Sequence, residues 1–279
     1  MEETALSRRA RASQAAVAVA RRYGLEDCRP IVLQDWNNTI VHLAPASVVA
    51  KVSTSPLGQA GSRALTRELA VASHLAAREA PVVPPSSELP PGPHRHAGTE
   101  LTFWTLCAHG SGEIDPVEAG ETLRTILESL ATYAGTLPRF TDQLTEVRGV
   151  LDDPSALRAL AAQDRQFLKL MLDELEGRLG RVTFELRPLH GEAHLGNVLK
   201  TPSGLLWLDF ESACLGPLEW DLSTLPLEAF AAFASVDEPL LALLRRLRSL
   251  CVAVWCWVQP ERAPEVREAA EFHLASLRG

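Results

Sequence analysis

Two short polar segments in the second half of the chain carry residue types that are suited to phosphoryl transfer. In the first, Glu192 and Asn197 lie five positions apart on one polar loop, and in the second, Asp209 follows the apolar run Leu205–Leu208. Phosphoryl transfer requires an acidic group that orients the attacking hydroxyl, and hard oxygen ligands for the magnesium that neutralises the phosphates. Carboxylate and amide side chains supply both, so these residues predict a magnesium-assisted transfer site.

The order of these residues follows the pattern of protein kinases, in which a histidine precedes the catalytic acid and an asparagine follows it. His190, Glu192 and Asn197 occupy these places, and Asp209 stands where a metal-binding aspartate follows a strand. The segment from His190 to Asn197 resembles the His-Gly-Asp-x-His-x-x-Asn signature of the aminoglycoside phosphotransferase and choline kinase superfamily. The segment that contains Asp209 and Glu211 is similar to that family's metal-binding segment.

One residue departs from the family signature, because Glu192 stands where the family usually has a catalytic aspartate. A glutamate is one methylene longer, and a misplacement of about 1 Å can cost on the order of 100-fold in rate. Two interpretations therefore stay open: an active small-molecule kinase, which we favour, and a kinase-fold protein that binds a nucleotide or metabolite with weak or no turnover. A protein kinase is disfavoured, since no Gly-x-Gly-x-x-Gly loop joins the first two predicted strands.

The resemblance implies an α+β, bilobal protein-kinase-like fold, with a small N-terminal antiparallel sheet lobe that carries a helix and a larger, mainly helical C-terminal lobe. We place the boundary at the end of residue 107, so that 1–107 is the nucleotide-binding lobe and 108–279 is the helical lobe with the catalytic and metal-binding loops and the acceptor site.

The resemblance also implies the roles of the site residues. ATP or GTP would be the phosphoryl donor, Mg²⁺ would be held by Asn197, Asp209 and Glu211, and the acceptor would be a hydroxyl of a small molecule. Glu192 would orient that hydroxyl and receive its proton, so Glu192, Asn197 and Asp209 are the predicted catalytic residues. Asp221 is expected to brace the loop rather than to contact a ligand.

The elements that precede these loops must hold the nucleotide. Apolar alternation and turn residues predict three strands between residues 31 and 52, with a turn at Asn37 and Asn38. Lys51 lies late in the third strand, on the face opposite Val48 and Ala50. A lysine at this place can contact nucleotide phosphates, whereas a solvated lysine on an edge strand is the alternative that this segment alone leaves open.

The next predicted helix begins at a capping Ser62 and ends at Glu79, ahead of a proline. Glu68 borders the apolar stripe of this helix. Glu68 therefore either faces the sheet and holds Lys51 in place, as the helix glutamate of kinases does, or is a surface glutamate.

A proline-rich linker, residues 81–99, is predicted to follow, with His94 to His96 at a turn. The strand Leu101–Leu106 then runs into a break that a kinase uses to connect its lobes, with backbone N–H and C=O groups at the adenine edge. On that basis Leu106 and Ala108 are predicted to bind the nucleotide, together with Lys51 and Glu68.

The remaining chain is predicted to be mostly helical. Apolar residues at helical spacing predict helices over residues 7–22, 116–133, 153–179, 237–258 and 263–277. Trp220, Trp255 and Trp257 are expected to be helix core, and a cation–π wall for a cationic acceptor is the alternative.

The overall composition narrows the class of protein. The formal net charge of −8 argues against nucleic acid, whose backbone favours clustered Lys and Arg, and is compatible with a cationic acceptor. Five cysteines without a Cys-x-x-Cys pair disfavour a disulfide framework or a zinc site. The N-terminus lacks the apolar core of a signal peptide, and the longest apolar run, Leu250–Val258, is too short to span a bilayer. We therefore expect a cytoplasmic protein without a membrane partner and of unknown oligomeric state.

Overall fold

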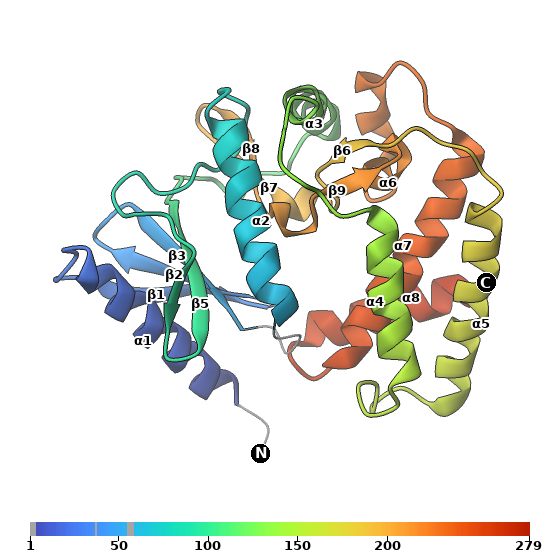
Figure 1. The fold of residues 1–279 in the computed structure, drawn as a ribbon, viewed down its shortest axis with the longest axis horizontal. Helices are drawn as coiled ribbons and strands as arrows, with labels where there is room; N and C mark the ends of the chain where they lie inside the picture. Colours follow the sequence, from blue (N-terminus) through green and yellow to red (C-terminus); the bar gives the residue numbers. More distant parts are fainter. Residues whose placement is uncertain (1–3, 37, 55–58) are drawn as a thin grey trace. The chain divides into compact units, whose positions relative to one another are not determined.

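The structure is a computed structural model that describes residues 4–36, 38–54 and 59–279 (Figure 1). The chain forms two compact units: unit 1 is Met1–Gly135 with Leu195–Ala213, and unit 2 is Thr136–His194 with Cys214–Gly279. Residues 108–135 and 195–213 thus pack with the N-terminal part of the chain. The functional division at residue 107 stays a prediction.

Unit 1 is built on an antiparallel sheet of five strands in the order β1-β2-β3-β5-β4. The strands are β1 (Arg29–Asp35), β2 (Asn38–Ala44), β3 (Val48–Ser53), β4 (His94–His96) and β5 (Thr99–Thr105). The three strands predicted between residues 31 and 52 are confirmed, while Asn37, assigned to their first turn, lies outside the described residues. Because β3 lies between β2 and β5, the edge-strand alternative for Lys51 is excluded.

The proline-rich segment contains a strand where the sequence predicts a turn. His94–His96 form β4, in which Arg95 pairs with Glu100 of β5, and the turn falls on Ala97 and Gly98, both at positive φ. The prediction of a turn at His94 to His96 is therefore wrong. A polar strand of three residues carries no apolar alternation, so it has no signal of its own in the sequence.

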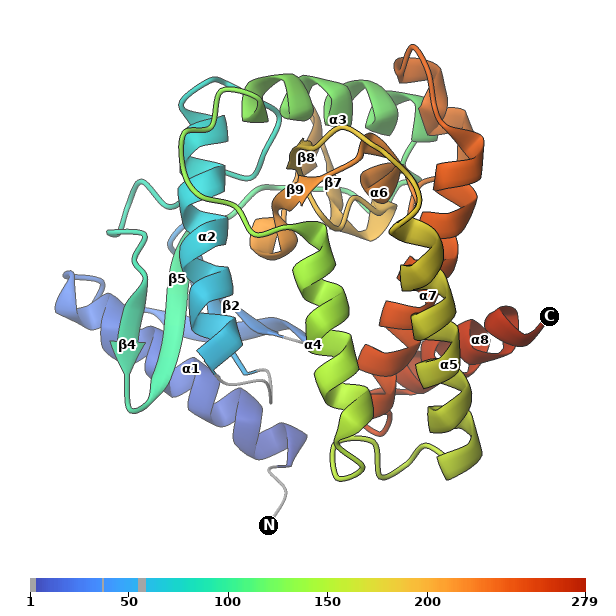
Figure 2. The same cartoon turned by 45° about the vertical axis from the view of Figure 1, so that its right-hand side comes forward.

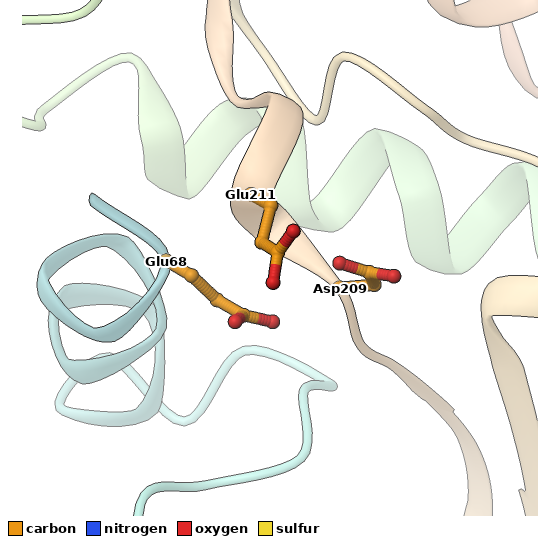
Figure 3. Close-up of side chains that lie close together, drawn as sticks. All are labelled: Glu68, Asp209 and Glu211. Carbon is orange, nitrogen blue, oxygen red and sulfur yellow. The ribbon is translucent and has the colours of Figure 1, made fainter. Parts of the chain in front are cut away.

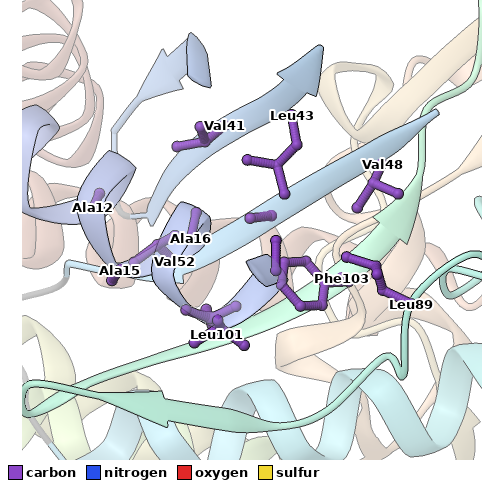
Figure 4. Close-up of a cluster of buried hydrophobic side chains, with 13 residues drawn as sticks. Ala12, Ala15, Ala16, Val41, Leu43, Val48, Val52, Leu89, Leu101 and Phe103 are labelled. Atoms are coloured by element: carbon purple, nitrogen blue, oxygen red, sulfur yellow. The ribbon is translucent and has the colours of Figure 1, made fainter. Parts of the chain in front are cut away.

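Helices α1 (Ala5–Arg22) and α2 (Gln59–Ala76) cover opposite faces of this sheet (Figure 1). The face toward α1 is a buried apolar core (Figure 4), in which small helix residues pack on apolar strand residues: Ala12, Ala15, Ala16, Val19, Val41, Leu43, Val48, Ala50, Val52, Leu101 and Phe103. Side chains alternate along a strand, so Lys51 points to the other face, toward α2.

The bounds of α2 differ from the prediction. The helix already includes Gln59, so Ser62 lies within it and is not its cap, and residues 55–58 ahead of it lie outside the described residues. The helix ends at Ala76, and Glu79 takes a left-handed conformation with φ 56°. A serine in a helical segment without a clear apolar start is a weak boundary signal.

Unit 1 is completed by α3 (Pro116–Leu130) and by a hairpin of β7 (Val198–Thr201) and β8 (Gly204–Trp207). Single 3₁₀ turns flank the hairpin: η1 (Leu195–Asn197) before it and η2 (Phe210–Ser212) after it. The buried indole of Trp207 donates to the Thr122 hydroxyl at 2.9 Å, which ties the hairpin to α3.

Unit 2 is mainly helical (Figure 2). Its helices are α4 (Phe140–Asp152), α5 (Ala162–Leu179), α6 (Leu218–Leu222), α7 (Glu238–Val258) and α8 (Pro264–Arg278), with a 3₁₀ segment η3 (Leu227–Ala232) and a short pair of strands, β6 (Arg187–Leu189) and β9 (Cys214–Gly216). Helices α4, α5 and α8 all contact α7. Asp237 caps α7 as its sequence suggests, since its carboxylate accepts from the Leu240 N–H at 2.9 Å.

The helices of unit 2 differ from the prediction in two places. Asp153 does not open a helix, because its carboxylate accepts from the Ser155 N–H at 2.8 Å in a local turn, and α5 begins only at Ala162. Helix α4 is not predicted, although Phe140, Leu144 and other buried residues of its stripe recur at helical spacing. Within the described part of the chain, none of the helices is long and apolar enough to cross a membrane.

Candidate active site

A lysine and three carboxylates from separate parts of unit 1 meet at one point, and Figure 3 shows the carboxylates turned toward one another. The Nζ atom of Lys51 lies 2.8 Å from both carboxylate oxygens of Glu68. It also lies 2.9 Å from Oδ1 of Asp209 and 2.9 Å from Oε1 of Glu211. The side chain of Glu68 is only 3% exposed, so the alternative of a surface glutamate is excluded.

Burial and charge shift the pKa values in this cluster. Burial disfavours the ammonium of Lys51, but the surrounding carboxylates outweigh this effect, so its pKa is raised well above the usual value. Burial raises the pKa of Glu68 and of Glu211, and the attraction of Lys51 opposes both shifts. One ammonium thus faces three carboxyl groups, and the raised pKa values of Glu68 and Glu211 mean that their negative charge is unfavourable here without a further cation.

Each side chain is placed by its own element. Lys51 lies on the central strand β3, and Glu68 lies on the face of α2 that covers it. Asp209 and Glu211 flank the buried Phe210 in η2, which packs on α2. Asp209 has φ 67° and ψ 60°, a left-handed conformation that aspartate tolerates better than most residues. This sharp bend turns two carboxylates toward Lys51.

The hairpin β7–β8 brings Asn197 next to this segment. Its register pairs Val198 with Trp207, and the N–H of Leu208 donates to the carbonyl of Asn197 at 3.0 Å. The chain therefore leaves Asn197, turns, and returns beside it immediately before Asp209. This explains how an asparagine and an aspartate apart in the sequence come close, and Asn197 is buried there.

Two further residues, Asn38 and Arg67, hold Glu211. No motif or spacing in the sequence points to either of them. The amide Nδ2 of Asn38, the first residue of β2, donates to Oε1 of Glu211 at 2.7 Å. Arg67 of α2 donates from Nε to the main-chain carbonyl of Glu211 at 2.8 Å, and from Nη2 to the same oxygen. Asn38 is 173 positions from Glu211, so only the fold shows this contact.

The predicted adenine contacts lie at the end of the same sheet. The N–H of Leu106 donates to the carbonyl of Ser47 at 2.9 Å, which ties the segment after β5 to the beginning of β3. Further along, the N–H of Gly110 donates to the carbonyl of Lys200 at 2.9 Å. Leu106 is half-buried and Ala108 is exposed. Their nucleotide-binding role stays a prediction.

Glu192 belongs to unit 2, where a buried aspartate braces its loop. The carboxylate of Asp221 accepts from the N–H of His190 at 2.9 Å and from the N–H of Gly191 at 2.7 Å, so the bracing role predicted for Asp221 is confirmed. The loop is tight, with Gly191 at φ 87° and the Glu192 N–H donating to Nδ1 of buried His190 at 3.3 Å. The Glu192 side chain itself is 44% exposed, and its Oε1 lies 3.9 Å from Nε2 of His194.

A buried arginine supports the same loop. Arg248 of α7 donates from Nη2 to the Gly191 carbonyl at 2.7 Å, and its guanidinium lies 3.6 Å from the centroid of the Trp220 ring. Burial lowers the pKa of Arg248, against the attraction of Glu192 and Asp221. Burial raises the pKa of Asp221 to about 6, and its hydrogen bonds and Arg248 oppose this shift. The signal for Arg248 in the sequence is its position on the otherwise apolar face of the helix predicted over residues 237–258.

Two of the three tryptophans predicted to be helix core are buried, whereas Trp255 is only half-buried. Trp220 and Trp257 are 0% and 8% exposed. The ring of Trp220 is covered by the protein's own Arg248, so it offers no open face to a cationic acceptor.

The oxygen donors of unit 1 fit a hard divalent cation. One carboxylate oxygen each of Glu68, Asp209 and Glu211 lies within 4.8 Å of the others. Glu68 is buried and presents both oxygens to Lys51, whereas the side chains of Asp209 and Glu211 are 33% and 23% exposed. Asp209 and Glu211, with Asn197 beside them, are therefore the residues that would hold magnesium.

Comparison with known families assigns the chain to one of them. The model of the phosphotransferase enzyme family matches residues 27–263, and the chain belongs to this family. A search among curated proteins gave no match. The family match, together with the solved structures described next, confirms the resemblance to aminoglycoside phosphotransferases and choline kinases seen in the sequence.

Several solved structures share the fold. A choline/ethanolamine kinase family protein from Mesorhizobium loti has 15% sequence identity and a TM-score of 0.64, covering 97% of this chain and 92% of that one. The GDP and kanamycin complex of APH(2")-IIia has 14% identity and a TM-score of 0.66, with 94% and 97% covered. Choline kinase LicA from Streptococcus pneumoniae has 13% identity and a TM-score of 0.65, with 94% and 99% covered. The predicted α+β, protein-kinase-like fold is confirmed.

Proposed function

We propose that the protein transfers the terminal phosphoryl group of ATP or GTP to a hydroxyl group of a small molecule in a magnesium-dependent reaction. Membership of the phosphotransferase family supports the class of reaction. The observation that carries the proposal is the cluster of Lys51 with Glu68, Asp209 and Glu211. Burying charged groups is costly, and a cluster with unbalanced charge is better explained by a ligand than by stability.

In this proposal the residues of unit 1 bind the donor. Lys51 contacts the nucleotide phosphates as a point charge, and Glu68 keeps Lys51 in position. Asp209, Glu211 and Asn197 hold magnesium, which neutralises the charge of the phosphates. The Leu106 carbonyl and the Ala108 N–H are the groups that would meet the nucleotide base.

Glu192 acts on the acceptor. Its carboxylate is partly exposed, so it can accept a hydrogen bond from a substrate hydroxyl and then its proton. In a loose phosphoryl-transfer transition state the position of this group matters more than its basicity, which allows a glutamate in place of aspartate.

Binding of the donor is tested by thermal melting of the wild type and Asp209→Ala with magnesium ATP and magnesium GTP. A ligand that binds only the folded state stabilises it by roughly 2.7 kcal/mol at a hundredfold excess over Kd. We expect a rise in melting temperature with at least one nucleotide, lost in Asp209→Ala and retained in Asp27→Ala, an exposed aspartate of the same unit. Absence of a shift with both nucleotides would refute the proposal.

Transfer is tested with labelled nucleotide and a panel of acceptors. The similar structures include complexes with kanamycin and with spectinomycin, a choline kinase and a choline/ethanolamine kinase family protein, so kanamycin, spectinomycin, choline and ethanolamine make a reasonable first panel. Removing a general base typically costs 10²- to 10⁴-fold, so Glu192→Gln should abolish measurable transfer without changing nucleotide affinity. Glu185→Gln, at an 80% exposed side chain of unit 2, is the control.

Because glutamate replaces the usual aspartate at position 192, a nucleotide- or metabolite-binding protein is the second candidate. Tight nucleotide binding with no transfer to a broad acceptor panel, in wild type and in Glu192→Asp alike, would favour it.

A further inference from the structure

Asn38 is a buried amide whose donor group is aimed at a carboxylate of the site. It is 9% exposed, and its Nδ2 lies 2.7 Å from Oε1 of Glu211. The β2–β3 register pairs Asn38 with Ser53, two residues beyond Lys51, so Asn38 lies at the same end of the sheet as the lysine. Hydrogen bonds to a charged acceptor are shorter and stronger than neutral ones, so this contact fixes the direction of the carboxylate.

Asn38 and Lys51 share one oxygen of Glu211. The Nζ atom of Lys51 lies 2.9 Å from the same Oε1 that accepts from Asn38. With two donors on Oε1, Oε2 is the oxygen that a metal ion would take. An amide carries no net charge, so Asn38 orients the carboxylate without neutralising it.

The two donors differ in how they respond to a ligand. The ammonium of Lys51 contacts three carboxylates at once, and a bound phosphate group would attract it away from Glu211. The contact from Asn38 does not depend on this competition. Arg67 fixes the main-chain carbonyl of Glu211, so side chain and backbone of this residue are held from β2 and from α2.

We propose that Asn38 is a positioning residue for the divalent cation: it holds Glu211 with one oxygen turned to the metal after Lys51 has moved to the phosphates. The inference rests on the proposed function, because it assumes a nucleotide-bound cation at Asp209 and Glu211. It assigns to the first residue of β2 a role that acts through the Glu211 carboxylate.

The test measures Mn²⁺ affinity by electron paramagnetic resonance in the presence of a non-hydrolysable ATP analogue. Loss of a residue that orients a metal ligand typically weakens metal binding 10- to 100-fold, and we expect this loss for Asn38→Ala. Asn38→Leu keeps a similar side-chain volume but cannot donate a hydrogen bond, so its loss should match that of Asn38→Ala. Nucleotide affinity without metal should stay unchanged, and Gln14→Ala, an exposed amide of α1, should bind Mn²⁺ like the wild type.

A double-mutant cycle separates this role from a general effect on folding. In the Glu211→Gln background, Asn38→Ala should cause no further loss of Mn²⁺ affinity, because its effect passes through the Glu211 carboxylate. Wild-type Mn²⁺ affinity in Asn38→Ala, or an equal loss in both backgrounds, would overturn the inference while the proposed function stands. A wild type that binds no Mn²⁺ with nucleotide would overturn the proposed function as well.

Discussion

The Nζ atom of Lys51 lies 2.8 Å from both carboxylate oxygens of Glu68, one on the central strand of a sheet and the other on the helix that covers it. The pair is almost completely buried, with side chains 8% and 3% exposed. Two further carboxylates share the same ammonium, so Lys51 is the only positive charge among the four groups of this cluster.

Lys51→Met should strongly destabilise the protein. It leaves buried carboxylates without their cation, and breaking a buried pair typically costs about 3–5 kcal/mol of unfolding free energy. Urea unfolding at neutral pH measures this loss. The double variant Lys51→Met/Glu68→Gln should recover part of it, because the most buried carboxylate is then neutral, and a double variant no more stable than Lys51→Met would contradict this explanation.

Asp209→Asn should separate stability from ligand binding. The variant removes one negative charge from a cluster that has an excess of them, and asparagine tolerates the left-handed conformation at this position. We expect an unliganded melting temperature equal to or above that of the wild type, and no rise with magnesium nucleotide. Differential scanning fluorimetry tests both, with Asp27→Asn as control; a normal ligand-induced rise in Asp209→Asn would count against this aspartate as a metal ligand.

Arg248→Met should destabilise the loop that carries Glu192. The substitution leaves the buried carboxylate of Asp221 without a nearby cation and the Gly191 carbonyl without its donor, a loss of about 3–5 kcal/mol. Arg246→Met, at an exposed arginine of the same helix, should stay within about 0.5 kcal/mol of the wild type in urea unfolding. Equal effects of the two substitutions would show that Arg248 has no special role.

Asp221 should make stability depend on pH. Its pKa is raised by burial from 3.8 to about 6, so between these values the folded protein holds a proton that the unfolded chain has released. The free energy of unfolding therefore falls as pH rises from about 4 through 6, by on the order of 3 kcal/mol for a shift of about two units.

Asp221→Asn lacks this titration. The unfolding free energy of the wild type minus that of Asp221→Asn should therefore decrease between about pH 4 and pH 7 and then level off. Urea unfolding over this range measures it. A difference that stays constant would mean that the carboxylate is ionised throughout.

Local patterns account for much of the fold. Apolar alternation places Lys51 on the face opposite Val48 and Ala50, and the structure has it there. Helical periodicity and a capping residue locate α7, with Asp237 as its cap. These features can be predicted because they depend mainly on residues that are close to one another in the sequence.

The patterns fail where an element depends on a distant partner or on competing local bonds. The polar strand β4 exists because β5 supplies its hydrogen bonds, and nothing in His94 to His96 themselves favours extended structure. Asp153 has the residue type of a helix cap, yet its carboxylate closes a turn on Ser155 instead. Helix α4 is a different case: its buried residues recur at helical spacing, so its absence from the predicted helices has no structural cause.

The family and the order of the motif residues can be read from the sequence, because the spacing of Glu192, Asn197 and Asp209 is covalent and does not depend on folding. Packing establishes which groups surround these residues. Asn38 and Arg67 reach Glu211, and Arg248 reaches Gly191, only after strands, helices and hairpin have packed. Contacts over such separations leave no periodic trace, since they follow from how the elements pack rather than from the preferences of each segment.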